Sequence, residues 1–228
     1  MPLLIKICGL STPDTLDAAL DAGADMVGFV FFRPSPRHLE FAAARALAVR
    51  VGDRALKVAL TVDADETWLA ACIEAVGPGL LQFHGGETPD AVRAMAARCK
   101  VPVMKALAVE TAADLARVAD YRAAADRILF DARAPKDATR PGGLGKPFDW
   151  HILENLDPGL PFMLSGGLDA GNVGAALGIT RPGGVDVSSG VERAPGEKDA
   201  DKIRAFIRAA RAGEAMTGTH PRSSASGV

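Results

Sequence analysis

The sequence predicts a single (β/α)8 barrel of the TIM type, and three observations lead to this fold class. Short apolar segments rich in Val, Ile and Phe recur along the chain. Eight of them qualify as strands, at 3–8, 26–32, 56–62, 80–84, 101–107, 127–132, 161–166 and 184–189. Alanine- and leucine-rich stretches with helical periodicity separate them, which predicts βαβ units and a parallel sheet. Eight fairly even units in 228 residues lie near the small end of the range for this barrel.

Several of the intervening stretches begin with residues that favour a helix N-terminus. The clearest expected helices span 12–24, 63–77, 87–99 and 169–178. An open doubly wound sheet would use the same units, but the turn after the first strand has no glycine fingerprint for a dinucleotide. We therefore expect the barrel to occupy residues 1–212. The small, polar segment 213–228 has no periodicity and is expected to be a disordered tail.

Composition excludes several classes of function. With 26 basic and 28 acidic side chains, the formal net charge is −2, so the chain lacks the basic excess that recruits nucleic acid or an acidic membrane surface. The three cysteines and four histidines have neither the spacing of a zinc site nor that of a disulfide framework. No apolar run approaches the roughly 20 residues of a membrane span, and the first residues lack the basic and then apolar pattern expected of a leader peptide. We expect a cytoplasmic protein without a metal.

Polar side chains gather at the carboxyl ends of the predicted strands, on the faces expected to point inward. Alternate residues of a strand share a face, and the inward sets become more polar towards the end of each strand. These polar residues are Lys6, Cys8, Gln82, His84, Asp131, Ser165, Asp186 and Ser188. Barrel enzymes build their active sites at this rim, so the pattern predicts a site there.

Two glycine-containing loops at consecutive strand ends predict a phosphate site. Gly166 and Gly167 precede a helix expected to be capped at or near Asp169, and Ser188, Ser189 and Gly190 come where the last strand ends. Without a Cβ, glycine lets backbone N–H groups approach an anion, and a following helix N-terminus adds a favourable dipole. The seventh and eighth loops of these barrels are a frequent phosphate cradle.

The loop after the second strand, FRPSPRHLE, carries Arg33, Arg37 and His38 near the mouth. Arginine suits a two-pronged hydrogen bond to a planar carboxylate. The position of this loop alone is equally compatible with an ordinary basic surface loop.

The longest connector, DARAPKDATRPGGLGKPFDW, follows the sixth strand and contains Gly142, Gly143 and Gly145. It is not a nucleotide P-loop, because Arg140 stands where the first glycine is required and Pro147 replaces the Ser or Thr. We expect a mobile lid beside the rim carboxylate, with an idle insertion as the alternative.

The rim thus offers a thiol, Cys8, and a carboxyl, Asp131, on strands that lie apart around the barrel. One would remove a proton and the other deliver one. A free thiol with a pKa of about 8.5 is a poor base at neutral pH, so we expect the charge of Lys6 to favour the thiolate. Asp186 is expected to pair with Lys6, and Asp131 would need a raised pKa to act as an acid. Such a proton shuttle requires no cofactor and indicates an isomerase acting on a phosphorylated sugar.

The segments KICGL, GFVFFRPSPRHL, LQFHG, LFDA, PFMLSGGL and GVDVSSGVE, in this order, resemble the phosphoribosylanthranilate isomerase family. The resemblance runs from residue 5 to about 207. It implies a (β/α)8 barrel and the third dedicated step of tryptophan biosynthesis, in which the aminoaldose N-(5-phosphoribosyl)anthranilate becomes the aminoketose 1-(2-carboxyphenylamino)-1-deoxyribulose 5-phosphate by an Amadori rearrangement.

The resemblance also implies roles for individual residues. Cys8 in KICG would be the general base at C2, and Asp131 in LFDA the general acid at the furanose ring oxygen. Arg37 in PSPRH would hold the anthranilate carboxylate. The implied phosphate ligands are Gly166, Gly167, Ser189 and Gly190. His84 and Asp186 lie in family motifs and are assigned to the substrate-binding set.

Three alternatives remain open at this point. A metal-dependent sugar-phosphate epimerase would need several His and acidic ligands at the rim, where His84 with nearby carboxylates comes closest. A barrel that only binds a phosphorylated metabolite should lack the base or the acid, and both are present. An indole-3-glycerol phosphate synthase would need rim acids and lysines that the sequence does not offer. Whether the barrel is a monomer or a homodimer stays open.

Overall fold

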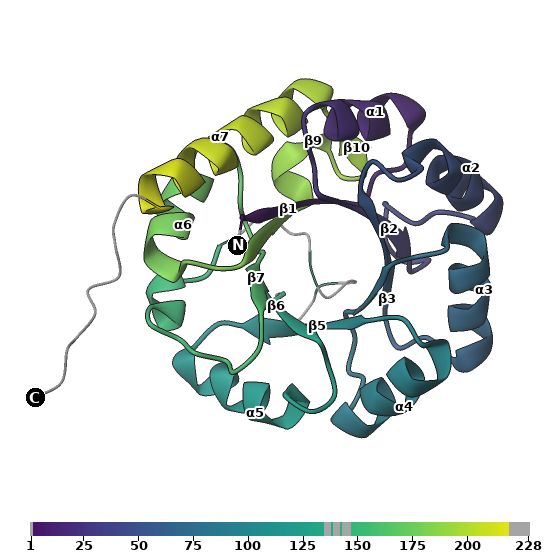
Figure 1. The fold of residues 1–228 in the computed structure, drawn as a ribbon, viewed down its shortest axis with the longest axis horizontal. Coiled ribbons are helices and arrows are strands. Elements are labelled where there is room, and N and C mark those ends of the chain that lie inside the picture. The colour runs from purple at the N-terminus through teal and green to yellow at the C-terminus, as the bar shows by residue number, and fades with distance from the viewer. Residues whose placement is uncertain (1, 135–137, 139–141, 143–146, 219–228) are drawn as a thin grey trace, which may run out of the picture.

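The computed structural model of this protein describes residues 2–134, 138, 142 and 147–218. A closed ring of parallel strands forms the centre, with each strand bonded to its neighbours in sequence and the last paired to the first. Figure 1 shows this ring, with helices around its outside. The strands are β1 Leu4–Cys8, β2 Met26–Phe31, β3 Leu56–Thr61, β4 Leu80–Phe83, β5 Val103–Val109, β6 Arg127–Ala132, β7 Phe162–Leu164 and β8 Gly184–Val187. The predicted (β/α)8 barrel is confirmed.

The connections between strands are helical, with short 3-10 turns where an α-helix is absent or brief. The α-helices are α1 Pro13–Asp21, α2 Phe41–Val51, α3 Glu66–Val76, α4 Pro89–Cys99, α5 Val118–Tyr121, α6 Val173–Thr180 and α7 Ala200–Gly218. The 3-10 turns are η1 Ala112–Arg117, η2 Trp150–Leu153 and η3 Ser189–Val191, and a small hairpin joins β9 Glu192–Ala194 to β10 Glu197–Lys198. The Asp65 and Thr88 side chains cap α3 and α4 by accepting backbone N–H bonds, as the capping pattern predicts for these segments.

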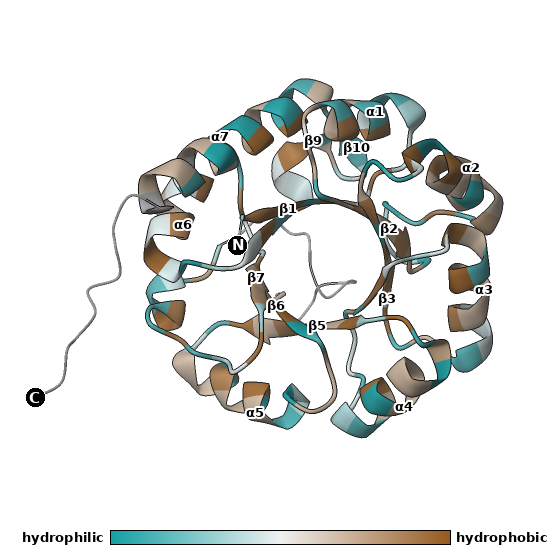
Figure 2. Cartoon of the chain, viewed as in Figure 1, coloured by the Kyte–Doolittle hydropathy of each residue, from teal (hydrophilic) through white to brown (hydrophobic). Residues whose placement is uncertain are grey.

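Apolar packing fills both faces of the strands, which explains their nearly continuous hydrophobic sequences. Figure 2 shows the ring of strands as predominantly hydrophobic, whereas the helices carry hydrophilic residues as well. One cluster joins the outer faces of the strands to the helices, and a second fills the barrel interior. The interior cluster consists of Leu4, Met26, Val58, Leu80, Met104, Ala106, Leu129 and Met163. Because this apolar layer fills one end of the barrel interior, the inward polar side chains converge above it, towards the carboxyl ends of the strands.

Helix α7 continues beyond the boundary expected from the sequence. The tail was expected to begin at Gly213, but residues 213–218 belong to the helix, so this part of the expectation is wrong. Glu214 accepts the backbone N–H of Leu3 at 2.5 Å, and Arg211 bonds the Leu3 carbonyl at 2.6 Å and Asp25 at 2.7 Å. These polar contacts hold the helix against the start of β1. Because the contacting side chains are polar, the sequence shows no apolar periodicity there. Residues 219–228 lie outside the described part of the chain.

None of the helices described in the structure is both long and apolar enough to cross a membrane.

Candidate active site

Cys8 ends β1 directly above a buried ion pair inside the barrel. The register of β1 and β8 places Lys6 beside Asp186, and Lys6 Nζ lies 2.9 Å from Asp186 Oδ1. The predicted pairing is therefore confirmed. Gly28 on β2 leaves the space this arrangement needs, because a Cβ there would lie 2.9 Å from Cys8 Sγ and 3.1 Å from Lys6 Nζ.

The electrostatics of Cys8 differ from the sequence expectation. Burial raises the pKa of the Cys8 thiol, Asp186 raises it further, and the charges of Lys6 and Lys198 only partly oppose this rise. The net direction is upward, so the expected lowering by Lys6 is outweighed by the loss of solvation. Burial acts in the opposite sense on Lys6, but the charges of Asp186 and Cys8 outweigh it and leave the pKa of Lys6 raised. The pair with Asp186 therefore favours the charged form of Lys6 beneath the thiol.

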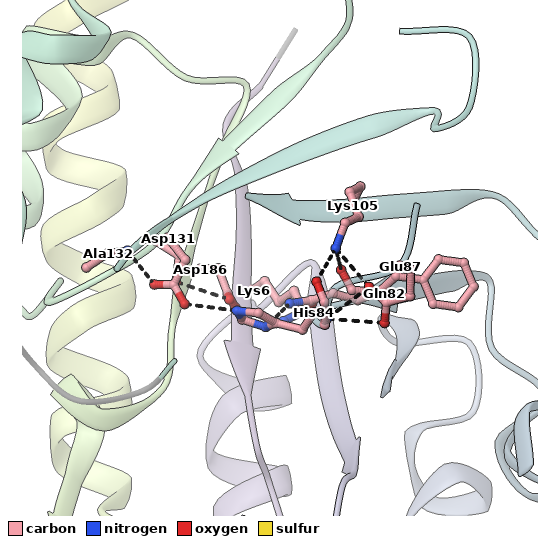
Figure 3. A network of polar contacts seen from close by, with 11 residues as sticks. Lys6, Gln82, His84, Glu87, Lys105, Asp131, Ala132 and Asp186 are labelled. Atoms are coloured by element: carbon pink, nitrogen blue, oxygen red, sulfur yellow. Dashed lines mark hydrogen bonds and ion pairs between the residues drawn. The ribbon is translucent and has the colours of Figure 1, made fainter. Parts of the chain in front are cut away.

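Asp131 is the penultimate residue of β6, and Figure 3 draws its polar contacts beside the Lys6–Asp186 pair. One carboxyl oxygen accepts the backbone N–H of Ala132 at 2.9 Å, and the other lies 3.1 Å from Nε2 of His84. On the far side of the His84 ring, Gln82 Nε2 lies 3.3 Å from Nδ1. Gly142 closes over this pair, since a Cβ there would lie 2.3 Å from Asp131 Oδ2 and 3.1 Å from His84 Nε2.

Arg37, from the loop after β2, is buried and held by a carboxylate that the sequence analysis missed. Its Nε and Nη2 each donate to Glu192 at 2.7 Å. Glu192 also accepts from Lys198 Nζ at 2.7 Å. Gly9, with φ of +80°, leaves room for the guanidinium stem, because a Cβ there would lie 2.6 Å from Arg37 Cδ.

Arg37, Glu192 and Lys198 form an arginine cluster, in which burial shifts the pKa values of Glu192 and Lys198 in opposite directions. Burial alone would raise the pKa of Glu192, but Arg37 and Lys198 outweigh it and the net pKa is lowered. Burial lowers the pKa of Lys198 to about 8, against the opposing charge of Glu192. Lys198 Nζ also donates to the carbonyl and hydroxyl oxygens of Ser188 at 2.9 and 3.1 Å, and the Ser188 hydroxyl donates to the Cys8 carbonyl at 3.1 Å. The arginine cluster thus reaches the backbone of the thiol residue.

The two glycine-containing loops lie against each other. A Cβ on Gly190 would lie 1.9 Å from the carbonyl oxygen of Leu168, so the loop after β8 packs tightly on the loop after β7. Gly166 and Gly167 both have positive φ, +89° and +68°, which favours glycine. Ser189 begins the η3 turn in the same loop as Gly190. The structure therefore brings the four predicted phosphate ligands to one side of the rim.

The helix after these loops starts later than the sequence suggested. Helix α6 begins at Val173, not near Asp169. The Asp169 carboxylate instead accepts the N–H groups of Gly171 and Asn172 at 2.7 and 3.1 Å. A polar turn of this kind carries the same sequence signal as a helix cap, which explains the shift.

A second buried lysine–glutamate pair supports the loops on the Asp131 side. Lys105 Nζ donates to Glu87 at 2.8 Å and to the Gly85 carbonyl at 2.8 Å. The Glu87 carboxylate also accepts the backbone N–H groups of Asp63 at 2.9 Å and Gly85 at 2.9 and 3.1 Å. Lys105 lies on the outward face of β5, so it is not one of the inward polar residues predicted from the sequence. A lysine within an apolar strand was nevertheless a sign of a buried ion pair.

A cavity of about 370 Å³ opens beside this loop. Its lining includes Asp63, His84, Gly85, Gly86 and Arg117. Two of the lid glycines, Gly143 and Gly145, lie outside the described residues, and so does most of the segment expected to form the lid. Within the described chain, no three His, Cys, Asp or Glu side chains are grouped so that they could hold a metal.

Comparisons with known proteins agree with this geometry. The family model described as N-(5'phosphoribosyl)anthranilate (PRA) isomerase matches residues 5–209. The N-(5'-phosphoribosyl)anthranilate isomerase of Nitrobacter hamburgensis is 65% identical over 214 residues, covering 94% of this chain and 95% of that protein. The enzyme of Bradyrhizobium diazoefficiens is 66% identical over 212 residues, covering 93% and 95%.

Solved structures extend the comparison to the fold. The phosphoribosyl anthranilate isomerase of Thermotoga maritima has a TM-score of 0.84 and 34% identity, over 92% of this chain and all of that one. A phosphoribosyl anthranilate isomerase in complex with reduced 1-(o-carboxyphenylamino)-1-deoxyribulose 5-phosphate has a TM-score of 0.81 and 33% identity over the same shares. The chain therefore belongs to the N-(5'-phosphoribosyl)anthranilate isomerase family and catalyses the aminoaldose-to-aminoketose step of tryptophan biosynthesis.

Proposed function

We propose that Cys8 and Asp131 are the general base and the general acid of this isomerase. The observation that carries the assignment is the placement of a buried thiol and a buried carboxyl on one rim, each at the end of its own strand. Strands β7 and β8 separate β1 from β6 around the ring, so the two groups approach a bound sugar from different sides. Each group also has its own polar network, which allows one to release a proton while the other takes one.

Ring opening and enolamine formation require one proton delivered and one removed. Asp131 gives a proton to the ring oxygen as the C1–O bond breaks, and the anilinic nitrogen supplies the electron pair of the iminium. Cys8 then takes the proton from C2, and the C–H electron pair forms the C1–C2 double bond of the enolamine. Proton uptake at C1 and loss of the C2 hydroxyl proton give the ketose, so the rearrangement consumes no oxidant or reductant and needs no cofactor.

We assign the two ends of the substrate to the two loop clusters. Arg37, whose orientation Glu192 fixes, supplies the positive charge for the anthranilate carboxylate. The paired loops after β7 and β8 bind the phosphate through their backbone N–H groups. Phosphate ligands in this proposal are Gly166, Gly167, Ser189 and Gly190. His84 and Asp186 complete the substrate-binding set, His84 through Asp131 and Asp186 through Lys6.

The same proposal covers partners and location. A phosphorylated small molecule is the partner, in line with the complex of a related isomerase with the reduced product. The net charge of −2 supports a protein without nucleic-acid or membrane partners, and the three free cysteines support a reducing, cytoplasmic setting. We propose a monomer or a homodimer, because a solved structure of the Thermotoga maritima isomerase shows monomers generated from a dimeric enzyme.

Fluorescence tests the acid–base assignment directly. The phosphoribosyl adduct of anthranilate is expected to fluoresce and the rearranged product is not, so turnover of freshly made substrate appears as loss of signal. In the presence of a chelator, we expect wild type to turn over and Cys8→Ser and Asp131→Asn to lose about 10²–10⁴-fold in kcat.

Matched controls are available in the same chain. Cys72→Ser changes another buried cysteine, in α3, and Asp120→Asn changes an exposed carboxylate on α5. Both should keep kcat within a few-fold of wild type. Turnover that survives Cys8→Ser or Asp131→Asn would remove that residue from its proposed role.

A further inference from the structure

Gln82 sits at the inner end of a chain of contacts that leads to Asp131. Its side chain is completely buried in β4, and its Nε2 lies 3.3 Å from Nδ1 of His84. The opposite ring nitrogen, Nε2, lies 3.1 Å from Asp131 Oδ2. The remaining atom of the amide, Oε1, is buried without a hydrogen-bond partner among the described residues. Figure 3 shows the three side chains joined in this order.

With His84 neutral, hydrogen-bond rules allow this chain two arrangements. A neutral imidazole has one N–H and one lone pair, so the proton at one ring nitrogen decides what the other nitrogen does. If the Gln82 amide N–H donates to Nδ1, then Nε2 carries the ring proton and donates to an ionised Asp131. If the amide is rotated by half a turn, its oxygen accepts from Nδ1–H, and Nε2 accepts the proton of a neutral Asp131. The two arrangements differ by one proton.

The surroundings do not lock either arrangement. The two ends of an amide have nearly the same shape, so rotation by half a turn needs no extra volume. Because the far end of the Gln82 amide meets no partner among the described residues, neither orientation gains a hydrogen bond there. Strand β4 fixes the backbone of Gln82 on both sides, through β3 and β5, so the amide itself is the adjustable part.

We propose that Gln82 is a positioning residue that sets the protonation state of Asp131 through the tautomer of His84. With its oxygen towards Nδ1, the amide holds Asp131 as the neutral acid that can protonate the ring oxygen. With its nitrogen towards Nδ1, the amide matches the ionised carboxylate, which cannot. The inference rests on the proposed role of Asp131 as the general acid.

The charged groups around the pair stay constant in the test. Lys6 and Asp186 form their ion pair in the barrel interior, and Asp63 and Arg117 line the cavity beside His84. Substitutions at Gln82 alter none of these groups. Gln82→Met adds no charge, so a change in its pH profile can be traced to the contact with Nδ1, whereas Gln82→Glu also adds a negative charge that acts in the same direction.

Nitrogen NMR of histidine-labelled protein reads the tautomer directly. The chain has four histidines, and His84→Asn identifies the His84 signals by their loss. In wild type we expect the Nδ1–H tautomer at low pH and the Nε2–H tautomer at high pH. The midpoint of this change should coincide with the alkaline limb of the kcat profile, where the acid is lost.

Two substitutions should move that limb in opposite directions. Gln82→Glu offers only acceptors to Nδ1, so it favours the neutral acid and should move the limb about one unit to higher pH. Gln82→Met would leave a buried Nδ1–H without an acceptor, so it disfavours the neutral acid and should move the limb to lower pH. A purely structural role would reduce kcat in both variants without opposite shifts.

Thr61→Val is the matched control. Thr61 lies on the neighbouring strand β3, and its hydroxyl is also buried without a partner among the described residues. The backbone carbonyl of Thr61 accepts the backbone N–H of His84 at 2.9 Å, a contact that valine keeps. We expect both the tautomer and the pH profile to be unchanged.

A His84 tautomer that does not change across the alkaline limb would overturn the inference, and so would shifts of the same sign in the two Gln82 variants. Failure of this inference can be told apart from failure of the proposed function, because Asp131→Asn tests the latter separately. If Asp131→Asn is inactive and the Gln82 variants show no opposite shifts, only the role of Gln82 is lost. If Asp131→Asn remains active, the general acid itself is wrongly assigned.

Discussion

At the residue scale, Gly28 shows how tightly the base is held. A Cβ at this position would lie 2.9 Å from Cys8 Sγ and 3.1 Å from Lys6 Nζ, both closer than ordinary packing. Gly28 pairs with Cys8 in the register of β1 and β2, so no backbone shift can relieve the contact without disturbing the barrel. The absence of one methyl group therefore sets the orientation of the thiol.

Gly28→Ala is expected to lower kcat/KM by about 10–100-fold, because displacement of a catalytic group by about 1 Å has effects of that size. Steady-state kinetics measures the effect. Gly178→Ala in α6 is the control, since nothing lies within 4 Å of its added Cβ. Alanine there should stabilise the helix by about 0.5–1 kcal/mol and leave kinetics unchanged. An unchanged kcat/KM for Gly28→Ala would contradict the tight packing described for the thiol.

At the element scale, the hairpin of β9 and β10 joins the arginine cluster to the base. Its turn residue Gly196 packs on the loop that carries Arg37, because a Cβ there would lie 2.6 Å from the Pro36 carbonyl oxygen. Lys198 bonds Glu192 and Ser188 and contributes a charge that lowers the pKa of Cys8. A short hairpin outside the barrel thus contacts the arginine cluster and also affects the base, Cys8.

Lys198→Met should move the acid limb of kcat/KM to higher pH. The reaction needs the Cys8 thiolate, burial has already raised the pKa of this thiol, and loss of a nearby cation raises it further. Activity in the variant therefore begins to rise only at higher pH. Lys198→Arg keeps the charge and should return the limb towards its wild-type position. A pH–rate series on all three proteins checks this, and an unmoved limb in Lys198→Met would be the contrary result.

The Lys105–Glu87 pair gives a second prediction at this scale. Glu87→Ala leaves Lys105 buried without its partner, which typically costs about 3–5 kcal/mol of the free energy of unfolding. Urea unfolding measures the loss. The control is Glu74→Ala, which breaks an exposed pair with Arg45 and should cost less than about 1 kcal/mol. Equal losses in the two variants would mean that the buried pair does not hold the loops around Gly85.

At the scale of the whole molecule, the last helix secures the start of the first strand. Strand β1 closes the ring by pairing with β8, and Arg211 and Glu214 of α7 bond the backbone of Leu3 just before it. The closure of the barrel therefore depends on contacts between residues separated by almost the full length of the chain.

Two truncated proteins test this closure. A chain that ends at residue 218 keeps Gly213 and Glu214, whereas a chain that ends at 212 loses both. We expect the free energy of unfolding of the shorter chain to be about 1–3 kcal/mol lower, because the partly buried N–H of Leu3 loses its acceptor. The comparison of urea midpoints checks this. Equal midpoints would mean that α7 contributes nothing beyond residue 212.

Much of the fold followed from local sequence. The eight strands were predicted because buried parallel strands are continuous apolar runs, and the strand ends were visible as the points where Cys8, His84, Asp131 and Asp186 appear. The end of α7 was missed because its contacts to Leu3 and Asp25 are polar and distant in sequence. No local periodicity records such contacts.

The amino-acid sequence by itself determined the barrel, the rim on which polar groups gather, and the family through the motifs around Cys8 and Asp131, because strand periodicity and motif residues are local properties. Only the tertiary structure decided which side chains contact the site residues. It placed Glu192 and Lys198 behind Arg37 and brought Gln82 to Asp131 through His84. It also reversed the expected lowering of the pKa of Cys8, because solvation depends on everything packed around a group and not on its neighbours in sequence.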